Sequence, residues 1–153
     1  PTVTFRLTVG AANDTEYCLG GQSACNIDWF WLLDTEGNTM STGLSCGATS
    51  CDGCLATGCP LICLTPSPLS PEGDQATWNG VRYVEDTCGE GTLCQQPSCA
   101  APGDYVARFC AYPLVGAGGS PGFDECSRAA QDPTCVEVPF SYPSSGVVEA
   151  VLE

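Results

Sequence analysis

The chain has 153 residues with 13 cysteines, and its 18 acidic residues outnumber four arginines, with no lysine or histidine. The resulting net charge of −14 excludes nucleic acid and anionic membrane surfaces as partners, because like charges repel. Without histidine and lysine, the chain cannot assemble Ser-His-Asp, Cys-His or Ser-Lys nucleophile systems, so we do not expect an enzyme.

The clearest predicted strand lies close to the first residue. Four apolar residues alternate with polar ones over residues 2–9, which indicates a strand with one buried face; they are Val3, Phe5, Leu7 and Val9. This strand is also a candidate assembly strand, which could add to the sheet of a neighbouring copy. The simpler alternative is that it pairs within its own domain. The loop that follows holds the sequon Asn13-Asp14-Thr15, which makes Asn13 a candidate glycosylation site.

The most hydrophobic segment is residues 27–33, with the sequence IDWFWLL. As a strand, it places Trp29, Trp31 and Leu33 on one face and apolar residues on the other, so we expect it in the interior of a sheet. Residues 34–38 predict a turn, and residues 39–42 a short partner strand.

Residues 43–75 predict one long excursion from the sheet. Five cysteines lie between Cys46 and Cys63, separated by small, turn-forming residues, and a proline-rich stretch follows that forbids helix and central strand. A loop of this length without secondary structure is uncommon in a compact domain, so we expect disulfides to pin it.

The second half of the chain predicts further strands. Residues 75–85 contain Asn79-Gly80, the strongest short signal for a two-residue hairpin turn. We expect a second Gly/Pro/Gln-rich loop around Cys88, Cys94 and Cys99. Strands are predicted over 104–112, 136–140 and 146–152, a flexible loop over 116–122, and one or two helical turns over 124–130.

These elements predict an all-β fold, a disulfide-stapled, Ig-like β-sandwich with long cysteine-rich loops, as a single domain over residues 1–153. A domain of this size can bury a sizeable core without covalent help, so its cysteine content indicates an oxidising environment. We expect an extracellular or cell-surface protein, present here in mature form after removal of a leader. No apolar run approaches the roughly 20 residues of a membrane span, so no membrane insertion is expected.

We interpret the cysteines as disulfides, with one left over because their number is odd. The small residues between them let the backbone approach to disulfide distance. The sequence leaves the pairing open, with local pairs inside the run and links to distant cysteines among the alternatives. The set is Cys18, Cys25, Cys46, Cys51, Cys54, Cys59, Cys63, Cys88, Cys94, Cys99, Cys110, Cys126 and Cys135.

Zinc is the competing interpretation of these cysteines. Cys51 and Cys54 form a C-x2-C knuckle, and Cys59 and Cys63 nearly form a second one. The gap of four residues between the two pairs is shorter than in zinc ribbons and fingers, and the other nine cysteines would remain unexplained. We therefore predict no metal and no cofactor.

Residues 69–112 carry a pattern of Pro71 and Gly73 before a strand, Trp78 followed by Gly80, and Pro102-Gly103-Asp104-Tyr105 at the start of the next strand. This pattern resembles bacterial Ig-like domains of the BsuPI-type proteinase inhibitors, and it is similar to cysteine-rich bacterial lipoproteins. The resemblance implies a sandwich fold. The cysteines depart from the inhibitor family, and no inhibitory residue carries over.

The functional expectation is an extracellular or cell-surface structural or interaction module, including a self-assembling filament or matrix subunit joined by strand addition. A secreted binding module, such as a proteinase inhibitor or ligand-capture domain, is the first alternative, and a thiolate metal-binding protein is the second. The expected partners are another protein or a second copy of the chain.

Overall fold

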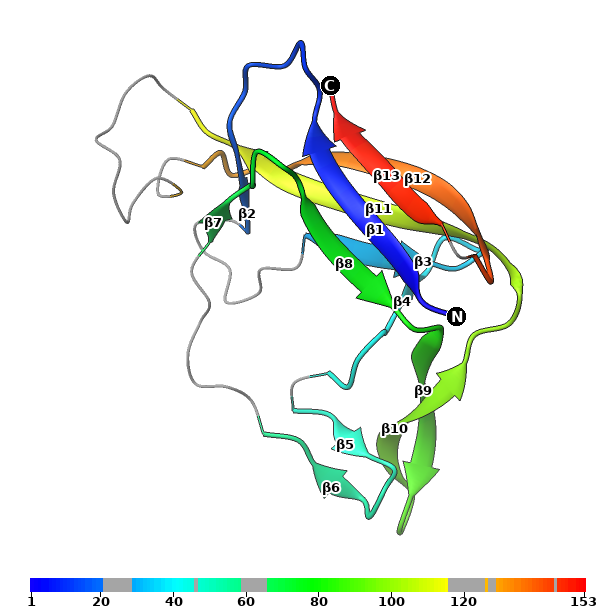
Figure 1. The fold of residues 1–153 in the computed structure, drawn as a ribbon. Coiled ribbons are helices and arrows are strands. Elements are labelled where there is room, and N and C mark those ends of the chain that lie inside the picture. The colour runs from blue at the N-terminus through cyan, green and yellow to red at the C-terminus, as the bar shows by residue number, and fades with distance from the viewer. Residues whose placement is uncertain (21–28, 46, 59–65, 116–125, 127–128, 145) are drawn as a thin grey trace.

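The computed structural model describes residues 1–20, 29–45, 47–58, 66–115, 126, 129–144 and 146–153. These residues form an all-β fold, in which two packed sheets make a sandwich and a smaller sheet projects from one end (Figure 1). The strands are β1 (Val3–Val9), β2 (Tyr17–Leu19), β3 (Phe30–Leu33), β4 (Thr39–Met40), β5 (Thr49–Ser50), β6 (Leu55–Ala56), β7 (Ser67–Pro68), β8 (Asp74–Trp78), β9 (Val81–Cys88), β10 (Thr92–Cys99), β11 (Gly103–Pro113), β12 (Thr134–Tyr142) and β13 (Val147–Leu152).

The first sheet has the strand order β13-β1-β8, so the two ends of the chain lie side by side. β1 pairs parallel with β13 and antiparallel with β8. Its side chains alternate as predicted, because Val3, Phe5 and Leu7 are fully buried while the residues between them are half-buried.

This pairing corrects the hypothesis that β1 adds to a neighbouring copy. Both edges of β1 are hydrogen-bonded within its own sheet. Of the four residues named for assembly, Val3, Phe5 and Leu7 are buried in the core, and Val9 is partly buried against it. A strand with two paired edges has no free N–H and C=O groups for a second copy. The simpler alternative, pairing within the domain, is what the structure shows.

The second sheet has the order β4-β3-β11-β2-β7, and β12 pairs with β11. β3 lies between β4 and β11, which confirms the predicted interior position of the hydrophobic segment, and β4 is the predicted return strand. β11 is the longest strand, and its residues Tyr105, Ala107, Phe109 and Ala111 face the core as the alternation predicted.

Aromatic rings join the two sheets. Phe5 from the first sheet lies 4.6 Å from Phe30 and 5.1 Å from Phe140 between ring centroids, and both partners belong to the second sheet. Trp78 at the end of β8 contacts Tyr105 and Tyr142 in the same way. Such tilted and edge-on pairs add directional packing to the burial of apolar area, so this layer fixes the sandwich.

The predicted hairpin at Asn79-Gly80 is wrong. β8 pairs with β1, whereas the next strand, β9, pairs with β10 in a different sheet, so the dipeptide is a corner and not a hairpin turn. Gly80 has φ +80°, and its carbonyl accepts from the Ala100 amide at 2.8 Å. The Asn-Gly signal correctly marks a left-handed backbone position, but it cannot specify which strands follow.

Gly80→Ala is expected to destabilise the protein by about 1–3 kcal/mol. A Cβ here would overlap the hydroxyl group and ring of Tyr142, and the backbone stays in the left-handed region that L-residues disfavour. The measurement is chemical denaturation with the disulfides intact. Gly37→Ala, at φ +82° with open space around the added carbon, is the matched control for backbone strain alone. Equal losses for the two variants would contradict the role of Tyr142.

The predicted turn over residues 34–38 is a loop organised by Asp34. Its Oδ1 accepts hydrogen bonds from the backbone N–H groups of Asn38 at 2.8 Å and Glu36 at 2.9 Å. These bonds, led by the one from Asn38, lower the pKa of Asp34 because they favour the charged carboxylate.

Asp34→Asn is expected to lower stability at neutral pH, with a difference from the parent protein that closes in acid. A carboxyl group with a lowered folded-state pKa contributes stability above its unfolded pKa and loses that contribution as the pH falls through the folded value. Denaturation curves at several pH values measure this difference. Glu90→Gln, in the β9–β10 loop, controls for the loss of one negative charge, and a pH-independent Asp34→Asn effect would contradict the role of ionisation.

Several expectations fall partly or wholly outside the described residues. These include the loop over 116–122 and most of the helical turn over 124–130; of the latter, Cys126 is described and Ala129 forms an isolated bridge with Leu114. The excursion over 43–75 contains three short strands, with β5 and β6 in the projecting sheet and β7 beside β2.

Candidate functional site

The projecting sheet is the candidate functional site, and we call it the stapled arm. It consists of β5, β6, β9 and β10 in the order β6-β5-β10-β9, within residues 47–58 and 81–99, and it extends away from the sandwich (Figure 1). β9 and β10 form a hairpin with eight register pairs, closed by the three residues Gly89, Glu90 and Gly91. The predicted loop around Cys88, Cys94 and Cys99 is therefore wrong, because all three cysteines lie on these two strands.

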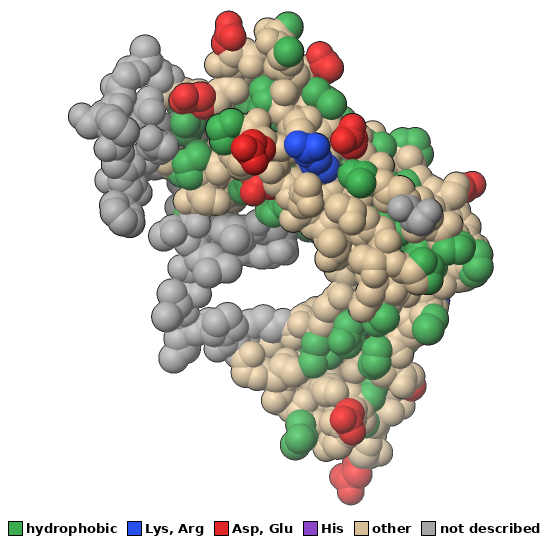
Figure 2. Space-filling view, in the orientation of Figure 1, with side chains coloured by type: hydrophobic (Ala, Val, Ile, Leu, Met, Phe, Trp, Pro, Cys, Tyr) green, Lys and Arg blue, Asp and Glu red, His purple; other side chains and the backbone are tan. Residues whose placement is uncertain are grey.

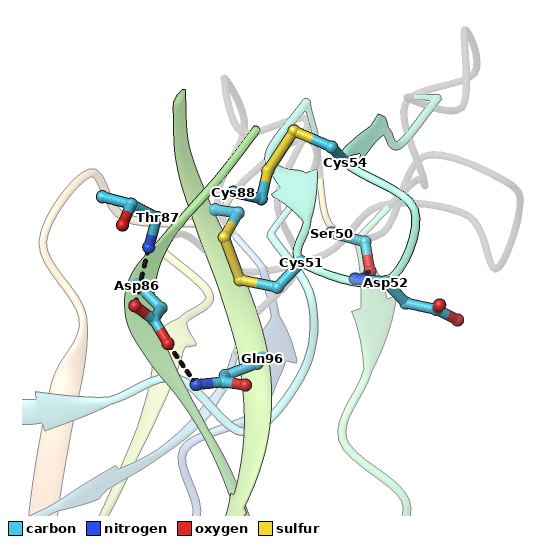
Figure 3. Close-up of a disulfide and its surroundings, with 9 residues drawn as sticks. Ser50, Cys51, Asp52, Cys54, Asp86, Thr87, Cys88 and Gln96 are labelled. Atoms are coloured by element: carbon cyan, nitrogen blue, oxygen red, sulfur yellow. Dashed lines mark hydrogen bonds between the residues drawn. A yellow bond between two sulfur atoms is a disulfide. The ribbon is translucent and has the colours of Figure 1, made fainter. Parts of the chain in front are cut away.

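Two disulfides lie on one face of the arm. Cys51 bonds to Cys94, with Cα atoms 5.0 Å apart, and Cys54 bonds to Cys88, with Cα atoms 5.7 Å apart (Figure 3). The pairing decides between alternatives that the sequence left open. Neither Cys51 nor Cys54 pairs with another cysteine of the run between Cys46 and Cys63, and neither has a free thiolate that could bind zinc. Both instead fasten the excursion to the hairpin.

Strand alternation places every second side chain of β9 and β10 on the opposite face. Leu55 follows Cys54 directly and Leu93 precedes Cys94 directly, so both point away from the sulfur atoms. The register agrees, because Ser50 pairs with both Leu55 and Gln95, and Gln95 is two residues from Leu93. We call this the open face of the arm. Its apolar and thiol members are Leu55, Val81, Tyr83, Leu93, Pro97 and Cys99, and the same register also places Ser50, Glu85, Thr87 and Gln95 on it.

The open face carries the two most exposed large hydrophobic side chains of the described chain. Leu93 is 70% exposed and Leu55 is 68% exposed. Figure 2 shows hydrophobic side chains along the arm, with acidic side chains toward its far end. Single exposed apolar residues are ordinary, but a shared face on a rigid projection is typical of a contact surface. Sequence reasoning missed it, although the alternation in Cys54-Leu55 and Leu93-Cys94 was a usable signal.

The arm has almost no core of its own. Among its described residues, only Cys94 is buried, at 2% exposure. Hydrogen bonds on the sulfur face add local order, since Gln96 donates to Asp86 at 2.6 Å (Figure 3). A small sheet without a hydrophobic layer is marginal in water, so the disulfides are what keeps the arm folded.

The other described cysteines lie in or beside the sandwich. Cys18 bonds to Cys126 across 108 residues of sequence, and Cys110 bonds to Cys135, which is its direct partner in the β11–β12 register. Cys99 is free and exposed, on the open face. The structure thus identifies an unpaired thiol of the kind the odd count predicted. The remaining four cysteines, Cys25, Cys46, Cys59 and Cys63, lie outside the described residues.

Asn13 has a structural role that the sequon did not indicate. Its Nδ2 donates to the hydroxyl of Tyr17 at 3.2 Å and to the carbonyl of Leu152 at 3.1 Å, while its Oδ1 accepts from the Thr15 amide at 3.0 Å. The side chain ties the loop after β1 to the last strand. A glycan would replace one of the two Nδ2 hydrogens, so glycosylation and this contact compete.

Comparison with protein-family models, curated proteins and solved structures finds no significant match to this chain. The resemblance to Ig-like inhibitor domains therefore stays a prediction. Within the described ranges, no helix has the length and hydropathy to cross a bilayer, and no three His, Cys, Asp or Glu side chains gather as metal ligands.

Proposed function

We propose that this protein is an extracellular interaction module that associates with a second copy of itself through the open face of the stapled arm. The observation that carries the proposal is the division of the arm into a disulfide face and an exposed apolar face with Leu55 and Leu93. Binding to a flexible loop loses free energy in ordering that loop, whereas a covalently braced arm is ordered in advance.

A second copy is the partner that this face favours. In a two-fold interface each exposed leucine is buried twice, which doubles the apolar contribution of a small surface. Cys99 lies on the same face and has no partner within its own chain. In the oxidising environment that the four described disulfides support, two such thiols related by symmetry can form one interchain bond.

Sedimentation velocity over a wide concentration range tests the proposal on the oxidised full chain carrying Cys99→Ser, in which Cys99 cannot form an interchain disulfide. We expect a reversible dimer, and Leu93→Asp should weaken it by about a hundredfold or more, because each of two buried leucines contributes about 1.5–3 kcal/mol. Val147→Asp is the matched control, since Val147 is 55% exposed on β13, a strand of the first sheet that is not part of the arm. A protein that stays monomeric at the highest concentration contradicts self-association.

The covalent part of the proposal has its own test. Non-reducing gels of concentrated protein should show a dimer that Cys99→Ser abolishes, while the noncovalent dimer persists in sedimentation. Alkylation of the unfolded, unreduced monomer fraction, followed by peptide mapping, should label Cys99 alone among the nine described cysteines. Labelling of the eight bridged positions in freshly secreted protein would argue against an extracellular role.

A further inference from the structure

An open surface hollow of about 620 Å³, here called the cavity, lies on the outer face of the second sheet, on the side that does not pack against the first sheet. Its lining comes from four neighbouring strands: Trp31 on β3, Thr39 on β4, Arg108 and Cys110 on β11, and Cys135 and Glu137 on β12. The volume falls within the range of about 300–1,000 Å³ typical of small-ligand sites.

Three of these side chains form one cross-strand row. The register pairs Arg108 with Trp31 on one side and with Glu137 on the other, so all three project from the same face. Trp31 is half-buried, and its ring stacks on no other ring in the described part of the chain, unlike Trp29 and Trp78. An outward-facing indole beside a cavity presents a flat apolar surface with one N–H donor.

Arg108 and Glu137 give this cavity polar groups without net charge. Arg108 Nε donates to Glu137 Oε1 at 2.7 Å, and Arg108 Nη2 lies 2.5 Å from the same oxygen. Since both contacts use Oε1, Nη1 of the arginine and Oε2 of the glutamate remain outside this pair. The cavity therefore offers donors and an acceptor side by side.

The framework around this row is rigid. The next row along the two strands is the disulfide between Cys110 and Cys135, whose sulfur atoms form part of the lining. β11 and β12 are paired over nine register positions, so the backbone that carries Arg108 and Glu137 is ordered before any ligand arrives. Preorganised groups bind with a smaller entropic loss than flexible ones.

We propose that this cavity binds a neutral saccharide. A sugar ring has an apolar C–H face that packs on an indole, and adjacent hydroxyls that both accept from a guanidinium and donate to a carboxylate. The paired charges of Arg108 and Glu137 favour a neutral ligand over an ion, and the net charge of −14 disfavours anionic ligands. This site is separate from the stapled arm and does not depend on its function.

The test is a titration of the oxidised full chain with neutral oligosaccharides: cellohexaose, laminarihexaose, xylohexaose and mannohexaose, with heparin as the acidic comparison. The readouts are the NMR shift of the Trp31 indole N–H and calorimetry. We expect saturable, salt-insensitive binding to at least one neutral oligosaccharide, weakened about tenfold or more by Trp31→Ala. Arg108→Gln and Glu137→Gln should each also weaken it.

Matched variants separate the site from general effects. Arg82→Gln and Glu85→Gln change the same residue types on the arm, and they should leave saccharide binding unchanged, as should Leu93→Asp. Trp31→Phe keeps an aromatic ring and should retain part of the affinity, which guards against a folding defect in Trp31→Ala. Absence of saturation up to about 10 mM of every neutral oligosaccharide overturns the proposal, as does binding confined to heparin or unaffected by Trp31→Ala.

Discussion

Replacing Cys51, Cys54, Cys88 and Cys94 together by serine is expected to unfold the stapled arm while the sandwich stays folded. In the chain-entropy model, the bridge between Cys51 and Cys94, 43 residues apart in sequence, contributes about 4 kcal/mol. The second bridge closes the shorter remaining loop and contributes about 3 kcal/mol. The arm has only one buried residue in its described part to offset this loss.

Hydrogen exchange followed by mass spectrometry measures this outcome. Amides of β9 and β10 should lose their protection, while those of β1 and β11 keep it. The control is the pair Cys110→Ser and Cys135→Ser, because these residues lie opposite each other on strands that are already hydrogen-bonded along their length. Retained protection in the arm of the fourfold variant would show that its backbone ladder is sufficient, and it would weaken the argument for a covalently braced contact surface.

Phe5→Ala is expected to destabilise the whole sandwich by about 3–5 kcal/mol. Phe5 is fully buried on the central strand of the first sheet and contacts Phe30, Phe109 and Phe140 of the second sheet. Its removal leaves a cavity between the layers that the surrounding rings, held on paired strands, cannot fill. The measurement is denaturant unfolding of the oxidised protein.

Thr4→Ala provides the comparison for Phe5→Ala. Thr4 is the preceding residue of the same strand, half-buried on the opposite face, so its truncation changes strand propensity without opening the core. We expect it to cost less than about 1 kcal/mol. A loss of that size for Phe5→Ala would mean that the aromatic layer does not hold the two sheets together.

The two proposed surfaces can be tested independently because they lie on different sheets. The arm offers exposed leucines and a free thiol for a protein partner, whereas the outer face of the sandwich offers an indole and a neutral ion pair for a small polar ligand. Leu93→Asp should affect only association, and Trp31→Ala only saccharide binding. A variant that changes both would indicate that the dimer covers the cavity.

The period-two strands were predictable from sequence where one face is buried. In β1 and β11 the buried residues alternate with more exposed ones, because only one face of each strand packs against the core. The buried residues are Val3, Phe5 and Leu7 in β1 and Tyr105, Ala107 and Phe109 in β11. The hairpin of β9 and β10 could not be predicted in this way, because disulfides rather than an apolar layer support it. Its three cysteines, Pro97 and the two glycines of its turn are residue types typical of a loop.

Composition and alternation alone determined an all-β, disulfide-bonded chain whose first and last segments are strands with one buried face. These properties are local, since each follows from the residue types and their spacing over a few positions. Tertiary structure alone decided that Asn79-Gly80 is a corner between sheets, that Cys51 and Cys54 bond to β10 and β9, and that Trp31 joins Arg108 and Glu137 at one cavity. Each of these depends on which distant strands lie side by side, and the side-chain period of a single strand carries no information about its neighbour.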